Sequence, residues 1–469
     1  MMSIVIQEIE PPMCKHGPAR RFSGGEIQEF NEKTNRKRKA VSSKKPNEPY
    51  FACSAYRDIR LCSFRMEENR WIMMSDSARA ELNKKKWPVI TPENEYAYLF
   101  DDYDYTNAKT YAFCYDCRRV LVNPLVNPTA NVPTYHRFDY HLTTRCGEIV
   151  SNLPRSYFNY PCKLLEAATT NEGQAQFFFD ESVTGFIIEE LIKSSGYTKV
   201  LCIGCPSIHE EIVTNHSQSL SSFLLDIDIR FQQFFPSSQF AQFNMFNYFF
   251  FGDTTAEVRL QQFLLGEHKL PSPVISDIIL IIDPPFGGRM DFLAEVIRKI
   301  QTLITGIVEI SDESTFPAML LFFPYFNEHW ITRSFNGVKI TDFIVNYLNH
   351  NKFKRKSANE STTATTLNYR KISSSIVRMF TNLDRSKIDL SKLNSIMQTE
   401  NGDPFYRWCE RCARYVFHSN QHCIECNQCP ARDATKPYGH CDHCGICVKS
   451  SWKHCDQCKR CHLASSCNN

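Results

Sequence analysis

The middle of the chain contains four short runs of apolar residues. They occupy 199–203 (KVLCI), 222–226 (SFLLD), 277–283 (DIILIID) and 319–323 (MLLFF). Continuous aliphatic runs of this length are typical of strands buried on both faces of a parallel sheet. Between the last two runs, the apolar residues of 291–300 recur at helical spacing. Strands that alternate with helices predict a doubly wound α/β sheet.

A polar segment interrupts this pattern at 352–371. Its first part, KFKRKSANESTTATT, is charged and repetitive. This composition predicts a flexible basic loop within the α/β body. A solvated loop is favoured over a phosphate-binding one, because runs of charge usually face water.

The charge of the chain is unevenly placed. The formal net charge is only +3, yet residues 15–45 carry +7 and residues 402–469 carry +3. Basic ends on a slightly acidic body suit a polyanion that is held from its flanks. For 31–45 a solvated, disordered arm is an equally good interpretation. Residues 35–39 (NRKRK) also resemble a nuclear-import signal.

Membrane and secreted proteins are not favoured by the sequence. No apolar run reaches the ~18 residues that a membrane span needs. The first residues, MMSIVIQEIEPP, do not follow the pattern of a secretory signal. The chain has 21 Cys, and without a secretion signal these favour metal sites in a reducing compartment over disulfides.

The C-terminal region repeats one unit, His-Cys-x2-Cys-x2-Cys, starting at His422, His440 and His454. An interleaved assignment forms four Cys3His sites: Cys409, Cys412, His422 and Cys429; Cys423, Cys426, His440 and Cys447; Cys441, Cys444, His454 and Cys461; and Cys455, Cys458, His462 and Cys467. Closed tetrahedral sets of this kind hold structural zinc. The segment is too short to bury much apolar surface, so metal must supply folding energy. A cross-brace that exchanges ligands between sites remains an alternative.

Two further clusters precede the apolar body. The first combines Cys14, His16, Cys53 and Cys62, a set that spacing alone only suggests. The second combines Cys114, Cys117, His136 and His141, which follows two-Cys, two-His finger spacing with a long centre. About six structural zinc sites are therefore expected. The Cys that these sites leave over are interpreted as free core thiols: Cys146, Cys162, Cys202 and Cys205.

The sequence Asp283-Pro284-Pro285-Phe286 directly follows a predicted buried strand. In open α/β sheets, ligands bind at the carboxyl ends of strands. The Asp283 carboxylate and the Pro284 carbonyl could each accept an N–H of an adenine amine and so direct its lone pair toward an electrophilic methyl group. Phe286 offers a face on which an extruded base could stack. The competing interpretation is a plain strand-to-helix turn with Pro at its start.

A sulfonium cofactor would need a glycine turn after the first strand and an acid after the second. The residues Ile203, Gly204, Cys205 and Pro206 provide the turn, and Asp226 and Asp228 provide the acids. A segment at 244–246 could contact the cofactor adenine, and a segment at 176–180 could form a wall or lid, although core packing explains both equally well. Their candidate residues are Asn244, Met245 and Phe246, and Gln176, Phe177, Phe178 and Phe179.

Taken together, these motifs resemble the zinc-finger CCHC-domain-containing rRNA adenine-N6 methyltransferases of animals over nearly the whole chain. The residues that carry the resemblance are Cys14–Gly17 with Phe51–Ser54, Gln176–Asp180, Cys202–Gly204 with His209 and Glu210, Leu225–Arg230, Asn244–Asn247, Asp283–Gly288, Phe323–Phe326 and the three His-Cys-x2-Cys-x2-Cys units. The long centre of the middle finger and the segment 352–371 depart from the family pattern.

The resemblance implies a Rossmann-like class I methyltransferase sheet flanked by zinc modules at both ends. It implies S-adenosylmethionine as methyl donor, an adenosine of large-subunit ribosomal RNA as substrate, a central role for Asp283, and a nucleolar or cytoplasmic location. It also supports the N-terminal zinc site, as a GRF-type finger. The predicted domains are 1–80 (GRF-type finger), 108–150 (two-Cys, two-His finger), 151–400 (methyltransferase) and 402–469 (zinc ladder ending in a CCHC knuckle).

Three other functions are alternatives to a methyltransferase. A palmitoyltransferase needs Asp-His-His-Cys and membrane spans, and the chain shows neither. A ubiquitin ligase would not explain Asp-Pro-Pro-Phe after a buried strand. A non-catalytic, zinc-dependent RNA-binding scaffold is the serious alternative. DNA as substrate stays open, because the catalytic motif contacts only the base.

Overall fold

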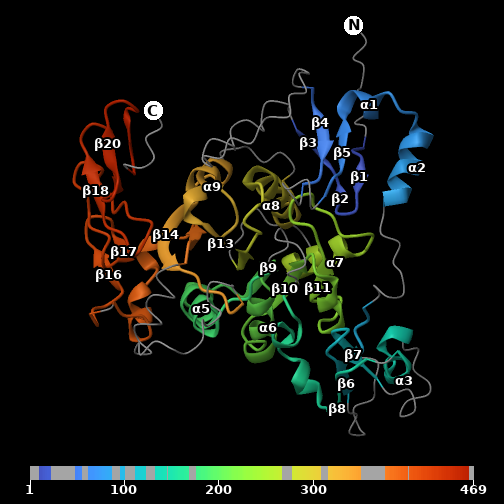
Figure 1. Ribbon diagram of the computed structural model, residues 1–469. Coiled ribbons are helices and arrows are strands. Elements are labelled where there is room, and N and C mark those ends of the chain that lie inside the picture. The colour runs from blue at the N-terminus through green and yellow to red at the C-terminus, as the bar shows by residue number, and fades with distance from the viewer. Residues whose placement is uncertain are drawn as a thin grey trace. The chain divides into compact units, whose positions relative to one another are not determined.

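The computed structural model describes residues 10–22, 48–54, 62–86, 96–100, 111–122, 133–144, 146–167, 176–266, 277–307, 315–349, 375–399 and 401–463. Figure 1 shows the chain as a ribbon coloured from the N-terminus to the C-terminus. The described residues form two compact units. Unit 1 comprises Met1–Ala175, Leu225–Gly266 and Pro285–Ile300, and unit 2 comprises Gln176–Leu224, Glu267–Pro284 and Gln301–Asn469. The predicted basic arm and the 352–371 loop lie outside the described residues.

A seven-stranded sheet has the order β11-β10-β9-β12-β13-β15-β14. Its strands are β9 (Lys199–Ile203), β10 (Ser221–Asp226), β11 (Phe240–Gln242), β12 (Ile278–Ile282), β13 (Met319–Pro324), β14 (Lys339–Ile344) and β15 (Val377–Thr381). Strand β12 runs parallel to β9 and to β13, whereas β15 is antiparallel to both β13 and β14. The predicted Rossmann-like α/β sheet is confirmed, and the antiparallel β15 makes it a mixed sheet.

The pairing register places the ends of two central strands level with each other. Ile282 of β12 lies opposite Ile203 of β9. The chain therefore leaves the sheet at the same height after each strand, and the backbone N–H of Asp283 donates to the carbonyl of Ile203 at 3.1 Å. Every residue of β12 is buried, as its continuous apolar run predicts.

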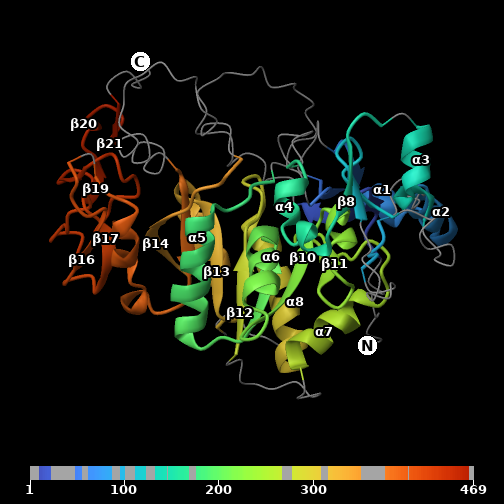
Figure 2. The same cartoon turned by 90° about the horizontal axis from the view of Figure 1, so that it is seen from below.

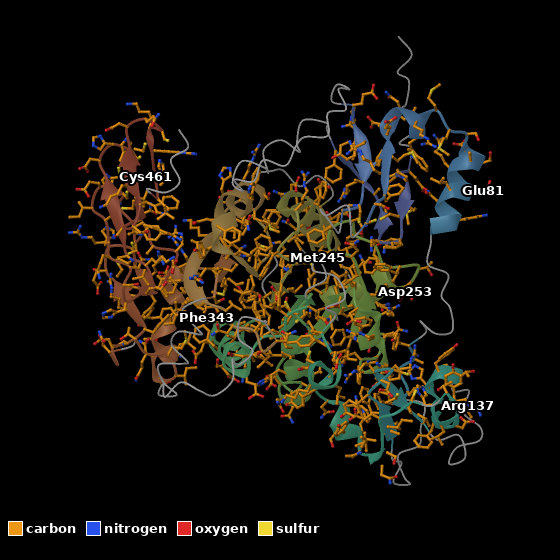
Figure 3. The ribbon with its side chains drawn as sticks, in the orientation of Figure 1. Glu81, Arg137, Met245, Asp253, Phe343 and Cys461 are labelled. Carbon is orange, nitrogen blue, oxygen red and sulfur yellow. The ribbon has the colours of Figure 1, made fainter. Side chains whose placement is uncertain are left out.

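In unit 2, short helices cover both faces of the strands. Helix α5 (Glu181–Phe186), which continues as the π-helical turn Ile187–Ile192, and α6 (Pro206–Asn215) lie on one face (Figure 2), and α9 (Glu328–Ser334) lies on the other (Figure 1). Phe343 of β14, labelled in Figure 3, packs against Phe186 of α5 with ring centroids 5.0 Å apart. The core of this unit is therefore aromatic as well as aliphatic.

Three small hairpins follow the sheet in unit 2. They are β16 (Tyr406–Cys409) with β17 (Arg414–Phe417), β18 (Tyr438–Cys441) with β19 (Ile446–Lys449), and β20 (Lys453–Cys455) with β21 (Arg460–His462). Each is only three or four residues long per strand, so none can build an apolar core of its own.

Unit 1 contains two further small modules. The first has β1 (Met13–Cys14) with β2 (Gly17–Pro18), the sheet β3 (Arg20–Phe22), β4 (Tyr50–Ala52) and β5 (Arg65–Glu67), and helices α1 (Glu68–Ile72) and α2 (Asp76–Lys86). The second has β6 (Tyr111–Cys114) between β7 (Arg119–Leu121) and β8 (Ile149–Leu153), with α3 (Phe138–Thr143) and α4 (Pro161–Leu164). Helix α2 and strand β8 run across the predicted boundaries at 80 and 150, which stay predictions.

Two longer helices complete the described chain. Helix α7 (Ala256–Leu265) belongs to unit 1, and α8 (Met290–Thr305) begins six residues after Pro284. The apolar periodicity at 291–300 lies within α8, so that predicted helix is confirmed. Among the described helices, none has the length and apolarity to cross a membrane.

Candidate active site and zinc centres

Asp283 directly follows strand β12 and begins the loop that leads to α8. Its backbone is fixed to Ile203, as described above, and its Oδ1 accepts a hydrogen bond of 2.9 Å from the Oη of Tyr347. Pro284 is buried, whereas Asp283, Pro285 and Phe286 are half-buried. The loop closes with a bond from the Gly288 N–H to the Pro285 carbonyl at 2.7 Å. The predicted catalytic residue is thus held at both its backbone and its side chain.

Tyr347 is a neutral hydrogen-bond donor in this arrangement. It is 1% exposed, and burial, together with the charge of Asp283, raises its pKa well above the ordinary value. Its ring stacks on Phe179 at 5.2 Å and packs on Phe177, also at 5.2 Å. The hydroxyl therefore keeps its proton and presents it to the carboxylate.

The segment 176–180 is paired with 346–349. The Phe178 N–H donates to the side chain of Asn349, the Leu348 N–H donates to the Phe178 carbonyl, and the Asn349 amide donates to the Gln176 carbonyl. Phe179 and Phe178 are buried, and Gln176 and Phe177 are half-buried. The segment predicted as a wall thus forms one side of the Tyr347 environment, while a cofactor contact stays a prediction.

The turn after β9 bends at Gly204, whose φ of +71° lies in the left-handed region that favours glycine. Pro206 is the first residue of α6, and Cys205 is buried just before it. The Phe179 N–H donates to Ser207 Oγ at 3.2 Å, which fastens the 176–180 segment to the start of α6. Burial lowers the pKa of His209 on the same helix to about 3, so this histidine is neutral beside Ser222.

The two predicted ribose acids, at the end of β10, differ in their partners. Asp228 forms a forked ion pair with Arg230, with a shortest distance of 2.6 Å. Asp226 is 5% exposed and accepts the Asp228 N–H at 2.9 Å. Burial, assisted by the charge of Asp228, raises the pKa of Asp226 to about 7. Asp226 is therefore the better candidate for a ribose hydroxyl, because the guanidinium of Arg230 already engages Asp228.

The 244–247 segment has a structural role that the sequence did not indicate. The side-chain amides of Asn244 and Asn247 both donate to the His16 carbonyl, at 2.7 and 3.1 Å. Asn244 is 1% and Phe246 2% exposed, and Met245 is half-buried. A Cβ on Gly288 would lie 2.4 Å from the Phe246 ring, so this ring requires glycine there. The segment supports the first zinc module, and its contact with a cofactor stays a prediction.

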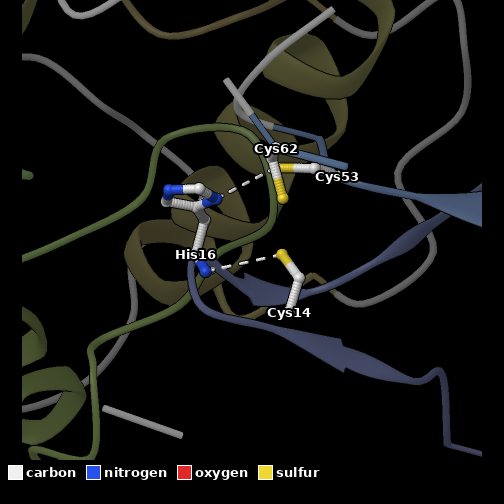
Figure 4. A group of neighbouring side chains, drawn as sticks. All are labelled: Cys14, His16, Cys53 and Cys62. Atoms are coloured by element: carbon white, nitrogen blue, oxygen red, sulfur yellow. Dashed lines mark hydrogen bonds between the residues drawn. The ribbon is translucent and has the colours of Figure 1, made fainter. Parts of the chain in front are cut away.

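The structure gathers Cys14, His16, Cys53 and Cys62 with their ligand atoms within 4.8 Å of one another (Figure 4). Cys53 Sγ lies 3.4 Å from His16 Nδ1, and the His16 N–H donates to Cys14 Sγ at 3.4 Å. Three of the four side chains are buried. A closed Cys3His set of this size suits structural zinc.

The middle cluster corrects one predicted ligand. Cys114, Cys117, His141 and Cys146 come together, and His136 does not belong to the group. His136 is fully buried and is engaged elsewhere: its Nδ1 lies 2.8 Å from the Val120 carbonyl, and its Nε2 accepts the Ala97 N–H. Cys146, predicted to be a free thiol, lies 3.4 Å from His141 Nδ1. This module is therefore Cys3His, not two-Cys, two-His.

The ladder follows the interleaved assignment. Its three complete groups are Cys409, Cys412, His422 and Cys429; Cys423, Cys426, His440 and Cys447; and Cys441, Cys444, His454 and Cys461. In the fourth, Cys455, Cys458 and His462 are described, whereas Cys467 lies outside the described residues.

A recurring backbone turn supports zinc in these modules. The residue after the second Cys has a positive φ in five Cys-x2-Cys pairs, at Arg118, Ala413, Asn427, Gly445 and Lys459. Non-glycine residues rarely adopt this conformation. In three of the pairs the backbone N–H of the second Cys donates to the sulfur of the first at 3.4 Å. The turn presents both sulfurs to one point, which is the arrangement a tetrahedral ion requires.

Comparison of the sequence with known proteins identifies relatives of this chain. A family profile described as "Probable N6-adenine methyltransferase" matches residues 170–372. The "rRNA N(6)-adenosine-methyltransferase ZCCHC4" of Homo sapiens is 29% identical over 91% of this chain and 73% of its own length. The protein of the same description from Xenopus tropicalis is 30% identical over 88% of this chain and 73% of its own length. The chain belongs to the ZCCHC4 methyltransferase family.

Membership of the ZCCHC4 family confirms the resemblance inferred from the sequence and the class of enzyme. The matched profile spans β9 to β14, including Asp283 and Tyr347, but ends before β15 and the ladder. Similarity to the ZCCHC4 proteins extends over about nine-tenths of the chain, far beyond this profile.

Two residues of these sites were missed in the sequence. Cys146 could have been found, because His141-x4-Cys146 repeats the spacing of His462-x4-Cys467 and makes the middle module Cys3His like the rest. Tyr347 carries no such signal, since it follows Asp283 by 64 residues and belongs to no motif.

Proposed function

We propose that this protein methylates the N6 atom of an adenosine in ribosomal RNA, with S-adenosylmethionine as donor. The relatives are named for that reaction. The observation that carries the proposal for this chain is Asp283, held at the end of β12 by Ile203 and Tyr347. A fixed acceptor at the carboxyl end of a central strand is where an amine substrate would be oriented.

The residues present fit such a cofactor. When bound, S-adenosylmethionine supplies an electrophilic methyl group on a sulfonium. Asp226 is a buried carboxylate whose partner is a backbone N–H, which suits the acceptance of ribose hydroxyls. The glycine turn at Gly204 leaves the sheet level with Asp283.

The substrate amine would be oriented by Asp283 and the Pro284 carbonyl. Each accepts one N–H, so the nitrogen can become tetrahedral and direct its lone pair at the methyl group. Transfer of the methyl group would leave an extra proton on the nitrogen, and the Asp283 carboxylate or water would accept it. Phe286 is half-buried and offers a ring for the extruded base.

Methyl transfer from labelled S-adenosylmethionine to unmodified total rRNA, followed by nucleoside analysis, tests this function. The intact chain is expected to yield N6-methyladenosine and Asp283→Ala none. The same assay on a DNA strand of the same sequence shows whether the enzyme requires RNA or also accepts DNA. Binding of cofactor and RNA without transfer would instead support a non-catalytic scaffold.

A nucleolar and cytoplasmic location is also proposed. It is supported by the basic 35–39 sequence and by the named substrate of the relatives. Microscopy of the tagged chain, compared with a variant in which Arg36, Lys37 and Arg38 are changed to Ala, tests it. Loss of nuclear signal in the variant is expected, and an unchanged distribution would contradict a role for this sequence.

A further inference from the structure

We infer that Tyr347 is a positioning residue of the methyl-transfer site: it fixes the carboxylate of Asp283 in the orientation that receives the substrate amine. This inference rests on the proposed function, because it assigns a role to a neighbour of the proposed catalytic residue. Its geometric basis is the 2.9 Å hydrogen bond from Tyr347 Oη to Asp283 Oδ1.

The carboxylate needs such a partner. The backbone of Asp283 is fixed by Ile203, but a short side chain on a fixed backbone can still rotate about its own bonds. A carboxylate has about four lone-pair positions, so one donated hydrogen bond orients its plane and leaves capacity to accept an amine. Tyr347 donates that bond from a side chain with no charge of its own.

Tyr347 is itself held in place from three sides. Its ring packs on the rings of Phe177 and Phe179. Its neighbour Asn346 accepts the Asp180 N–H through its carbonyl at 3.2 Å, and Leu348 and Asn349 bond to 176–178. Phe179 is joined in turn to Ser207 of α6 and packs on Phe322 of β13. The hydroxyl is therefore anchored to the sheet by elements on both sides of β12.

This arrangement also explains the 176–180 segment. Its aromatic residues were candidates for a wall or lid over a cofactor, yet their described contacts hold the Tyr347 ring. A tyrosine that served only to fill the core would not need its hydroxyl directed at the predicted catalytic carboxylate. Its ring alone would satisfy the packing.

The decisive variant is Tyr347→Phe, which keeps the ring that packs on Phe177 and Phe179 and removes only the hydroxyl. We expect kcat for rRNA methylation to fall about 10- to 100-fold, because small errors in the placement of reacting groups cost rate at this scale. The KM values for S-adenosylmethionine and rRNA and the melting temperature should change little. Since the lost hydrogen bond favours the charged carboxylate, the acid limb of the kcat/KM profile should move to higher pH.

Tyr406→Phe is the matched control. Tyr406 is also 1% exposed, and its hydroxyl accepts the Ile344 N–H at 3.1 Å, away from Asp283. This variant should lower the melting temperature, because it leaves a buried N–H without its acceptor, while kcat at a permissive temperature stays that of the parent. A fall in kcat that merely follows instability would appear in both variants.

A double-mutant cycle with Asp283→Asn shows whether Tyr347 acts through Asp283. If it does, adding Tyr347→Phe to Asp283→Asn should cost much less than adding it to the parent. A kcat for Tyr347→Phe within twofold of the parent, with an unchanged acid limb, would overturn the inference while leaving the proposed function intact. A parent chain that binds but never methylates rRNA would remove the proposed function, and the inference with it.

Discussion

The first module of the C-terminal ladder and the modules after it share one ligand pattern, but different forces hold them together. In the first module Cys409 and Cys429 are buried, as are Phe405, Val416 and Phe417 between and around them. In the second module all four ligands are only half-buried. Ile424, Ile446 and Trp452, which belong to the later part of the ladder, are exposed.

Equivalent positions in the hairpins β16–β17 and β18–β19 make the difference clear. Arg414 and Ile446 each lie two residues after the second Cys of their module. Arg414 is 5% exposed, whereas Ile446 is 56% exposed. The charged side chain is thus buried and the apolar one faces water, the reverse of what hydropathy alone predicts.

Asp342 explains the buried arginine. This residue lies in the irregular part of β14, between Ile340 and Ile344, where the pairing register with β15 shifts. Its carboxylate accepts from Arg414 Nη1 at 2.6 Å, from the Phe417 N–H at 3.0 Å and from Asn420 at 2.9 Å. The first module is therefore built onto the edge of the sheet, and its fold has two sources: the metal and this contact. The later hairpins depend far more on the metal.

Of the changes considered, removal of zinc should produce the largest difference in stability between the first module and the later ones. Structural zinc contributes on the order of 10 kcal/mol or more to small modules, so a strong chelator should unfold the hairpins after residue 430. The first module should keep part of its protection through β14. Hydrogen exchange of the β17 and β19 amides, with and without chelator, measures this. Equal loss of protection in both hairpins would show that the Asp342 contact does not hold the first module.

The middle module extends the comparison to the N-terminal half. Cys146→Ser should release one zinc ion per chain, because Cys146 completes the Cys114, Cys117 and His141 group. His136→Gln should keep the full zinc content even if it lowers stability, because His136 bonds to Val120 and Ala97. Metal analysis of the purified variants reads this out. Cys162→Ser serves as the matched control. Zinc loss from His136→Gln with none from Cys146→Ser would show that the ligands are two Cys and two His after all.

The predictable strands are buried through their own apolar residues, whereas the missed strands contain polar residues whose partners lie far away in the sequence. The apolar runs at 199–203 and 319–323 correspond to β9 and β13 because their residues are buried by any parallel sheet. Strands β14 and β15 were missed, since polar residues interrupt them: Asp342 and Arg378 are 2% and 1% exposed. Their burial is compensated by groups remote in the chain, Arg414 for Asp342 and the Arg432 carbonyl for Arg378. No local pattern contains that information.

The candidate site shows the same division. Asp283, Gly204 and Asp226 could be named from the sequence because each lies at the carboxyl end of an apolar strand, where the geometry of the sheet fixes its place. Tyr347 could not, because its position depends on how 346–349 pairs with 176–178. His136 was mistaken for a ligand because ligand spacing does not reveal a histidine that bonds to backbone groups instead.

Breaking the Asp342 contact should have an intermediate effect. Arg414→Met removes the cation and leaves a buried carboxylate without its ion-pair partner, which costs roughly 3–5 kcal/mol in comparable sites. Chemical denaturation of the zinc-loaded chain measures the free energy of unfolding. The exposed pair of Lys193 and Glu189 is the control, because Lys193→Met should change stability little. If Arg414→Met and Lys193→Met proved equally mild, the first module would be held by its metal alone.

The matching change in the third module should have the smallest effect. Ile446→Ser alters the equivalent hairpin position, but its side chain is more than half exposed and its removal opens no cavity. The free energy of unfolding should change by no more than about 0.5 kcal/mol, and zinc content should stay the same. Denaturation of Ile446→Ser and Arg414→Met under the same conditions makes the comparison direct, because the two changes lie at the equivalent position of their hairpins. A loss from Ile446→Ser as large as that from Arg414→Met would mean that the later hairpins also depend on side-chain packing and not mainly on their metal.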